Sequence, residues 1–526
     1  MPTLDWLDRQ AAFQVATRTP THVLRPHATG HVFGDAVAAR NNLLIQGDNL
    51  QALKALLPFC RGRVKCIFID PPYNTKSAFE HYDDNLEHSQ WLSMMLPRLQ
   101  VLRELLSEDG SIWVTLDDAE AHYFKVMADE VFGRQCFIAD ITWKRRDGAP
   151  NDRRIGPVHD HLLVYSKGQG RTAKTSAEEM FNLMQRTEKA DAQYQIFEEP
   201  FGFDERGPFR KVDSTGNAKG GRHVESLTYP VTNPFTGEQV FPRKGRCWVY
   251  SRDVMEAMVK DRRYFWGKDG KAGTPMRKLF KSEAKPGMTA PSIWDDVGLN
   301  QHAAREIELL FGEKAAFETP KPEALMQRII HIASNPGDIV LDSFLGSGTT
   351  AAVAHKMGRR WIGVEMGDHA ITHCVPRLQK VIEGEQGGIS AAVNWQGGGG
   401  FQLLQLGAPL FDEQGDIHPD VRFADLAAFV WMRETGTALP AQAASGPMPM
   451  LGVHEGAAYY LLFNGILGDR RPASGNVLTS AVLDALRSLC GHAGPKVIYG
   501  EACRLGDARL KAEGIVFKQL PHAVPR

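Results

Sequence analysis

The chain has 526 residues, which is enough for three or four domains of ordinary size. Apolar residues make up 43% and charged residues 23%, so a disordered or fibrous protein is excluded. The 61 Lys and Arg residues are balanced by 62 Asp and Glu residues, which excludes a protein that is basic throughout. The sequence has no apolar run of about 18 residues and no secretory signal, and we therefore expect a cytoplasmic protein without a membrane partner.

Strand and helix patterns alternate over most of the first third of the chain. Residues 1–40 show little periodicity and are predicted to form an N-terminal arm. Within 41–168, strands are expected at 64–69, 111–116, 137–143 and 161–165, and helices at 50–57, 88–106 and 119–132. This alternation predicts one half of a doubly wound α/β sheet.

The alternation stops at 169–300, where glycine, proline and charged residues are dense. We predict an inserted domain there, beginning near 145 at the earliest. The alternation resumes within 301–396, where helices are expected at 322–333 and 349–357 and strands at 339–341 and 361–364. Four glycines at 397–400 are predicted to form a linker. The linker and a small C-terminal α/β domain occupy 397–526.

The sequence predicts no metal site. Its seven cysteines are irregularly spaced and include no CxxC pair, which argues against both a zinc site and a disulfide framework. His159 and His161 lie two residues apart, but the sequence shows no third ligand beside them. We therefore interpret both histidines as surface or sheet residues.

Positive charge is concentrated in one segment. Residues 141–290 contain 28 Lys and Arg against 19 Asp and Glu, and aromatic residues are interleaved with the cations. Such a segment suits a nucleic-acid surface, although a solvated basic face with core aromatics fits equally well. The candidate phosphate contacts are Lys144, Arg145, Arg146, Arg243, Lys244, Arg246, Arg262 and Arg263.

The first motif with chemical meaning is DSFLGSGTT, from Asp342 to Thr350, between a predicted strand and a predicted helix. Glycines at such a turn allow a ligand to approach the backbone, and a helix N-terminus favours negative charge. Glu365 ends the next strand, where an acid can accept hydrogen bonds from ribose hydroxyls. The motif predicts a site for a nucleoside cofactor; the alternative is a tight turn without a ligand.

The second motif is Asp70-Pro71-Pro72-Tyr73, at the carboxyl end of a predicted buried strand. The exocyclic amine of a base is a poor nucleophile because its lone pair is delocalised into the ring. The Asp70 carboxylate and the Pro71 carbonyl can accept both amine protons and free that lone pair. Tyr73 offers a ring face to an unstacked base. The alternative is a polar strand end with a Pro-Pro turn.

Both motifs within one sheet predict methyl transfer from S-adenosylmethionine to an amino group. At this point the sequence resembles the DNA amino-methyltransferases, whose catalytic motif is DPPY. The order of catalytic motif, basic insert and cofactor motif resembles their circularly permuted β class. Further segments resemble the modification (Mod) subunit of type III restriction–modification systems: LIQGDNL (44–50), ITWK (141–144), HDHLLVYSK (159–167), TPKPE (319–323) and IVFKQLP (515–521).

The resemblance implies roles for individual residues. Asp70, Pro71, Pro72 and Tyr73 hold a flipped base, and Trp143 packs beside it. The cofactor contacts are Asp48, Asn49, Lys321, Asp342, Ser343, Phe344, Gly346, Ser347, Gly348, Thr349 and Glu365. Ser343 departs from the family pattern, where proline is common. A turn lined by backbone should tolerate serine.

We therefore expect an enzyme that methylates the N6 amino group of adenine in double-stranded DNA, which also implies association with the nucleoid. The resemblance further implies a homodimer and a restriction subunit with helicase and nuclease activity as partner. The alternatives are an N4-cytosine enzyme, a stand-alone methyltransferase and a catalytically idle DNA-binding module. RNA or protein-amide substrates and a nicotinamide-dependent oxidoreductase fit the motifs less well.

Overall fold

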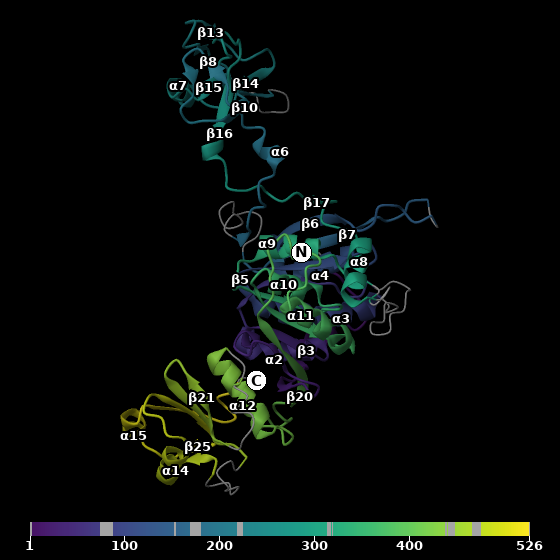
Figure 1. Ribbon diagram of the computed structural model, residues 1–526, viewed down its shortest axis with the longest axis vertical. Helices are drawn as coiled ribbons and strands as arrows, with labels where there is room; N and C mark the ends of the chain where they lie inside the picture. Colours follow the sequence, from purple (N-terminus) through teal and green to yellow (C-terminus); the bar gives the residue numbers. More distant parts are fainter. Residues whose placement is uncertain are drawn as a thin grey trace. The chain divides into compact units, whose positions relative to one another are not determined.

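A computed structural model of the chain describes residues 3–73, 88–151, 154–168, 180–217, 225–312, 317, 319–436, 439, 448–464 and 475–524. The chain divides into two compact units (Figure 1). Unit 1 comprises Met1–Asn182 and Pro291–Arg526, and unit 2 comprises Leu183–Ala290. Unit 2 lies within the range 169–300 in which the sequence predicts an inserted domain. Among the described helices, none is both long enough and apolar enough to cross a membrane.

Unit 1 is built around an eleven-stranded sheet, which confirms the expected doubly wound α/β fold. The strand order is β1-β20-β3-β19-β18-β4-β5-β7-β6-β17, and β2 pairs with β20. The strands from β20 to β5 run parallel, while β7 is antiparallel to both of its neighbours. The strands are β1 (His22–Pro26), β2 (Val32–Gly34), β3 (Leu43–Gln46), β4 (Val64–Ile69), β5 (Leu106–Leu116), β6 (Phe137–Lys144), β7 (His159–Ser166), β17 (Ile293–Trp294), β18 (Ile339–Asp342), β19 (Arg360–Glu365) and β20 (Gly400–Pro409).

Helices connect the parallel strands in two opposite directions along the sheet. The chain passes from β4 through α3 to β5, whereas it passes from β18 through α10 to β19 on the other side. Because such crossovers are right-handed, the two sets of helices cover opposite faces. The helices of unit 1 up to residue 435 are α1 (Arg9–Arg18), α2 (Asn49–Cys60), α3 (His88–Leu105), α4 (Ala121–Ala128), α8 (Asn300–Phe311), α9 (Glu323–Ala333), α10 (Thr349–Lys356), α11 (Val375–Ile382) and α12 (Phe423–Thr435).

The direction of the crossovers reverses between β18 and β4, which are adjacent in the sheet. Leu341 of β18 pairs with Ile67 of β4, and Ile67 pairs with Ile112 of β5. In open α/β sheets, ligands bind outside the carboxyl ends of the strands at such a reversal. The register therefore brings the segment after Asp342 and the segment after Ile69 to one edge of the sheet.

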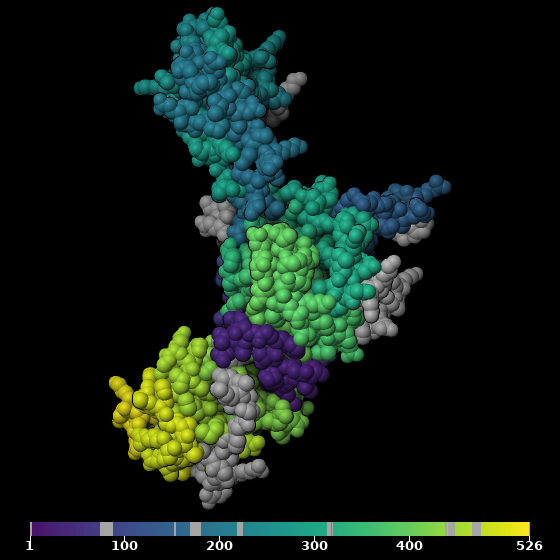
Figure 2. All heavy atoms as spheres, viewed as in Figure 1, coloured from purple at the N-terminus to yellow at the C-terminus, as the bar shows by residue number. Residues whose placement is uncertain are grey.

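Two sequence expectations differ from the structure. Residues 1–40 are not a free arm, because β1 and β2 both pair with β20. Glycines 397–400 are not a free linker, because Gly400 begins β20. Gly399, at φ +83°, packs against His355: a Cβ atom on Gly399 would lie 2.5 Å from His355 Nε2. Close backbone approach favours glycine at 397, 399 and 400, and a left-handed backbone, with φ +101°, favours glycine at 398. Figure 2 shows the N-terminal residues in purple against the green segment that follows residue 400.

The C-terminal part of unit 1 contains a second sheet with strand order β21-β22-β24-β26, in which β22, β24 and β26 are parallel. Its core includes Tyr460, Leu483 and Ile498. This part has the small α/β architecture that the sequence predicts. Its elements are β21 (Met450–His454), β22 (Ala457–Leu461), β23 (Val477–Leu478), α14 (Ser480–Cys490), β24 (Lys496–Gly500), β25 (Ala502–Cys503), α15 (Asp507–Ala512) and β26 (Ile515–Gln519).

Unit 2 has short antiparallel strands around an aromatic core that includes Tyr229, Trp248, Tyr264 and Trp266. These four aromatic residues, which the sequence interleaves with cations, therefore serve packing. The elements are α6 (Glu188–Asp191), β8 (Glu198–Glu199), β9 (Gly202–Phe203), β10 (Phe209–Asp213), β11 (Thr215–Asn217), β12 (Val231–Thr232), β13 (Gln239–Val240), β14 (Arg246–Trp248), α7 (Arg252–Lys260), β15 (Tyr264–Phe265) and β16 (Met276–Phe280).

A buried network of charges joins α9, α10 and α11 in unit 1. The Glu323 carboxylate accepts hydrogen bonds from Lys356 Nζ and Arg377 Nη2, both at 2.8 Å, and from the Ile389 backbone N–H at 3.0 Å. Lys356 also pairs with Glu385. Burial would raise the pKa of Glu323, but the cations Arg377 and Lys356 outweigh burial and lower it. These helices are therefore held by ionic contacts as well as by apolar packing.

We predict that Glu323→Ala lowers the free energy of unfolding by about 3–5 kcal/mol, because Lys356 and Arg377 lose a buried counter-ion. Urea denaturation followed by tryptophan fluorescence measures the change. Glu104, whose pair with Arg61 is exposed, is the matched control, and Glu104→Ala should cost no more than about 1 kcal/mol. Equal losses for both variants would contradict the assigned role of the buried network.

Candidate active site

The Asp70 carboxylate lies where β4 ends, beside the end of β5. Ile69 pairs with Val114, so Asp70 is level with Thr115, whose hydroxyl donates to Asp70 Oδ1 at 2.6 Å. Lys321 Nζ donates to Asp70 Oδ2 and lies 5.3 Å from the centre of the Tyr73 ring. The structure thus brings Lys321, which the family resemblance assigns to the cofactor, to the Asp70 carboxylate.

Tyr73 is linked to the basic segment through Asp160 of β7. The Tyr73 hydroxyl donates to Asp160 Oδ2 at 3.5 Å, and Arg145 Nε lies 3.0 Å from Asp160 Oδ1. Burial, followed by the nearby carboxylates Asp160 and Asp70, raises the pKa of Tyr73 well above its ordinary value. Tyr73 is therefore a neutral phenol.

The Pro-Pro turn is held by a tryptophan. Trp91 of α3 is fully buried, and its indole Nε1 donates to the Pro72 carbonyl at 2.6 Å. Because both prolines restrict φ, this bond completes the fixing of the turn. The Pro71-Pro72 backbone is therefore held in one conformation before any ligand binds.

The Asp342 carboxylate organises the cofactor motif from within. Its Oδ1 accepts the Phe344 backbone N–H at 2.9 Å, and its Oδ2 accepts the Thr350 hydroxyl at 2.6 Å. Burial raises the pKa of Asp342 to about 7, and the nearby Asp70 and Glu365 carboxylates also act in this direction. Asp342 shapes the turn that joins β18 to α10.

The two glycines of the motif have left-handed backbone, with φ +57° at Gly346 and +83° at Gly348. The Gly346 N–H donates to Glu365 Oε2 at 2.7 Å, which ties the turn to the end of β19. Arg377 Nη1 donates to Thr349 Oγ1 at 2.8 Å and so joins the motif to the buried charge network. Ser347 Oγ lies 3.2 Å from Thr349 Oγ1. Backbone N–H groups and a buried carboxylate therefore line this turn.

Asp48 and Asn49 lie at the start of α2, on the same edge. Asp48 Oδ1 caps the helix by accepting the Gln51 N–H at 3.0 Å, and Asn49 Nδ2 donates to the Ser343 carbonyl at 2.9 Å. Arg98 contacts both side chains, at 3.0 Å and 2.5 Å respectively. Asn49 therefore contacts the cofactor motif directly, and Asp48 precedes it at the N-terminus of α2; their contacts with the cofactor stay a prediction.

The predicted DNA contacts in unit 1 lie at the end of β6. Trp143 is fully buried and donates through Nε1 to the Gly298 carbonyl at 3.0 Å, so it offers no ring face to an extruded base in this structure. This differs from the sequence expectation, because β6 lies between β7 and β17 and its side chain points inward. Lys144 pairs with Asp147 at 2.7 Å, whereas Arg146 is exposed.

The predicted DNA contacts in unit 2 fall into two groups. Arg246 pairs with Asp213, and Arg263 pairs with Asp261 and Glu283. The remaining cations are exposed, and none of them forms an ion pair with a carboxylate among the described residues: Arg243, Lys244 and Arg262. These three are the better candidates for phosphate contacts.

The sequence analysis missed Thr115, Trp91, Asp160 and Arg377. Asp160 lies in a segment that supports the family resemblance, and Thr115 ends a predicted strand at a level that only the strand register reveals. Nothing in the local sequence marks Trp91 or Arg377. Their roles depend on contacts between distant segments.

The comparisons with known proteins agree with this geometry. Residues 64–375, more than half of the chain, match the N6_N4_Mtase family, described as DNA methylase. The chain belongs to this DNA methylase family. The match confirms the resemblance to the DNA amino-methyltransferases.

Individual relatives of this DNA methylase include type III and type II enzymes. The StyLTI Mod subunit of a type III restriction–modification enzyme from Salmonella typhimurium is 33% identical over 346 residues, which are 59% of this chain and 49% of that protein. The type II methyltransferase M.KpnI from Klebsiella pneumoniae is 30% identical over 331 residues, which are 59% of this chain and 75% of that protein. The chain spans about half the length of two type III Mod subunits that it matches, those of HindVI and StyLTI.

A search of solved structures matched the PvuII DNA methyltransferase, described as cytosine-N4-specific, with 17% identity and a TM-score of 0.33. The match covers 66% of this chain and 89% of that one.

We predict that Asp342→Asn changes how stability depends on pH. In the folded chain the pKa of Asp342 is about 7, above its ordinary value in the unfolded chain. This difference contributes stability that is fully present below the ordinary pKa and is lost as the pH rises through 7, because the unfolded chain releases the proton first. An amide carries no such penalty, so the variant should gain stability relative to the wild type between pH 5 and pH 8. Urea unfolding midpoints of both chains, without cofactor, measure the difference. A difference that does not change with pH would contradict the raised pKa.

Proposed function

We propose that this DNA methylase transfers a methyl group from S-adenosylmethionine to the N6 amino group of a flipped adenine in double-stranded DNA. The observation that carries the proposal is the convergence of the DPPY and DSFLGSGTT motifs at the adjacent ends of β4 and β18. Family membership supports the reaction class. The form of the first motif, with Asp70 in the leading position, favours adenine over cytosine.

The turn from Asp342 to Thr349 suits S-adenosylmethionine. Gly346 and Gly348 let a ligand approach the backbone, and the Ser343 hydroxyl is buried without a hydrogen-bond partner among the described residues. When bound, the cofactor supplies a methyl group activated by its positively charged sulfonium. Phe344 would contact the adenine ring, and Glu365 would accept hydrogen bonds from the ribose hydroxyls.

Asp70 and the Pro71 carbonyl would receive the two protons of the target amine. The Pro72 carbonyl already accepts the Trp91 indole, which holds the turn in place for this task. Lys321 donates to one oxygen of Asp70 and Thr115 to the other, and each oxygen keeps a further lone pair that can accept an amine proton. Tyr73, a neutral phenol, would stack on the flipped base, which costs a few kcal/mol to unstack.

Similarity to type III Mod subunits supports a role as the modification and recognition subunit of a type III system. Under this proposal, unit 2 recognises the DNA sequence, the chain forms a homodimer and a restriction subunit is its partner. A stand-alone methyltransferase is the second candidate, because similarity to the type II methyltransferase M.KpnI does not single out a type III system. Co-purification with a restriction subunit encoded next to this chain would separate the two candidates.

Asp70→Ala and Asp70→Asn should lower the rate of methyl transfer to DNA by at least about 10²–10³-fold, because the amine loses a positioned acceptor. Transfer of tritium from labelled S-adenosylmethionine measures the rate, and nucleoside mass spectrometry identifies N6-methyladenine or N4-methylcytosine as the product. Cofactor affinity should persist, since Asp70 is not among the proposed cofactor contacts. Asp109, an exposed carboxylate paired with Lys65, is the control, and Asp109→Ala should leave the rate unchanged. Full activity in both Asp70 variants would overturn the role given to Asp70.

Replacing Arg243, Lys244 and Arg262 together by alanine should weaken DNA binding. Three lost phosphate contacts should reduce the slope of log K against log salt concentration by up to about 2.7, at roughly 0.9 for each contact. Filter binding at several salt concentrations measures the slope. The control variant removes the exposed cations Arg504, Arg509 and Lys511, which carry the same charge, and should leave the slope unchanged. Equal slopes for both triple variants would show that these cations of unit 2 are not on the DNA-binding face.

A further inference from the structure

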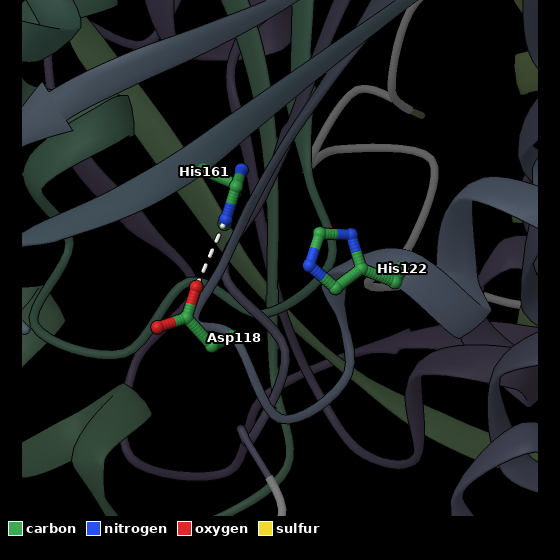
Figure 3. Close-up of side chains that lie close together, drawn as sticks. All are labelled: Asp118, His122 and His161. Carbon is green, nitrogen blue, oxygen red and sulfur yellow. Dashed lines mark hydrogen bonds and ion pairs between the residues drawn. The ribbon is translucent and has the colours of Figure 1, made fainter.

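Two histidines and an aspartate meet beside the catalytic edge of unit 1, at a place that methyl transfer does not use. Asp118 lies in the turn after β5, His122 in the first turn of α4, and His161 in β7 (Figure 3). One ligand atom from each side chain lies within 4.8 Å of the other two. Asp118 Oδ1 is 3.1 Å from His161 Nε2, and the two imidazole rings are 5.4 Å apart.

The backbone brings these side chains together by two independent routes. His161 is paired with Leu116 in the antiparallel β5–β7 ladder, which puts it next to the turn that follows β5. Asp117 holds that turn by accepting the Ala119 N–H at 3.0 Å, and its own carbonyl accepts the Ala121 N–H at 3.1 Å. The turn leads into α4 and so places His122 four residues after Asp118.

A further carboxylate orients His161. Both oxygens of Asp140 on β6 lie 3.1 Å from His161 Nδ1, on the side of the ring away from Asp118. A metal-binding histidine almost always donates its second ring N–H to a carboxylate or carbonyl, which fixes the tautomer and leaves the other nitrogen for the metal. Asp140 supplies this arrangement, and Nε2 faces Asp118 and His122.

We propose that Asp118, His122 and His161 bind one divalent transition-metal cation, for which Zn²⁺ is the best chemical match. Two imidazoles and one carboxylate are typical Zn²⁺ ligands, whereas Ca²⁺ and Mg²⁺ prefer oxygen alone. Ligand atoms of a tetrahedral Zn²⁺ site are about 3.3 Å apart, close to the spacing already present between Asp118 and His161. Asp118 and His122 are exposed, so their side chains can move the remaining distance. A water molecule would complete the coordination.

The proposed cation would tie the β5–α4 turn to β7. The neighbour of His161 in β7 is Asp160, which accepts the Tyr73 hydroxyl and pairs with Arg145. Bound metal would therefore stiffen the strand that supports the catalytic tyrosine without contacting the base or the cofactor. This role is structural and lies outside the proposed methyl transfer.

The test uses the full chain without an affinity tag, treated with a chelator and then titrated with ZnCl₂ by calorimetry. One Zn²⁺ should bind per chain and raise the melting temperature. His122→Ala and Asp118→Asn should each weaken binding at least tenfold, and Asp140→Asn should weaken it 10–100-fold. His159→Ala is the matched control, because the His159 ring packs 5.4 Å from that of His161 but contributes no ligand atom to the cluster, and it should change affinity less than twofold.

A gain of signal keeps the test independent of stability. When the His122→Cys variant is loaded with Co²⁺, its near-ultraviolet spectrum should show a thiolate-to-cobalt charge-transfer band. The Co²⁺-loaded wild type should not show this band. No binding of Zn²⁺ by the wild type, or equal affinities for the wild type and the His122→Ala and Asp118→Asn variants, would overturn the proposal. A loss in His159→Ala as large as that in His122→Ala would overturn the ligand set.

Discussion

The parallel pairing of β18 with β4 is the constraint on which the rest of this structure depends. These two strands are far apart in the chain, yet Leu341 and Ile67 are paired neighbours at the centre of the sheet. The crossovers leave this pair in opposite directions, so the segments after both strands reach the same edge without a helix between them. Because of this pairing, a methyl donor bound at the segment after β18 can meet a target amine bound at the segment after β4.

Electrostatics at this edge follow from the same convergence. Asp70, Asp342 and Glu365 come from three adjacent strands, and burial together with the Asp70 and Glu365 carboxylates raises the pKa of Asp342. Lys321 pairs with Asp70 and so partly offsets the negative charge at this edge. The Glu323–Lys356–Arg377 network contacts the cofactor motif through Arg377. The segment that contains Lys321 and Glu323 therefore contacts both motifs: Lys321 pairs with the Asp70 carboxylate, and Glu323 binds the buried cations Lys356 and Arg377.

The sequence alone predicts those features that local patterns encode. The runs VKCIFI and IVLD are buried strands as expected, and the residues after them are the proposed catalytic and cofactor residues. Residues 1–40 differ from the prediction because β1 and β2 pair with β20, and glycines 397–400 differ because Gly399 packs against His355 and Gly400 begins β20; no local pattern shows these contacts. Contacts between distant segments likewise bury Trp143 between β7 and β17 and bring Asp118 and His122 to His161, and no local pattern predicts them.

We expect S-adenosylmethionine, bound at the turn after β18, to direct its methyl group toward Asp70 and the Pro71 carbonyl after β4, which accept the protons of the target amine. A crystal structure of the chain with S-adenosylmethionine tests this directly. The account predicts that the adenine ring contacts Phe344, the ribose contacts Glu365, and the methyl carbon points toward the space between Asp70 and Tyr73. A cofactor bound elsewhere, or one whose methyl carbon points away from Tyr73, would contradict it.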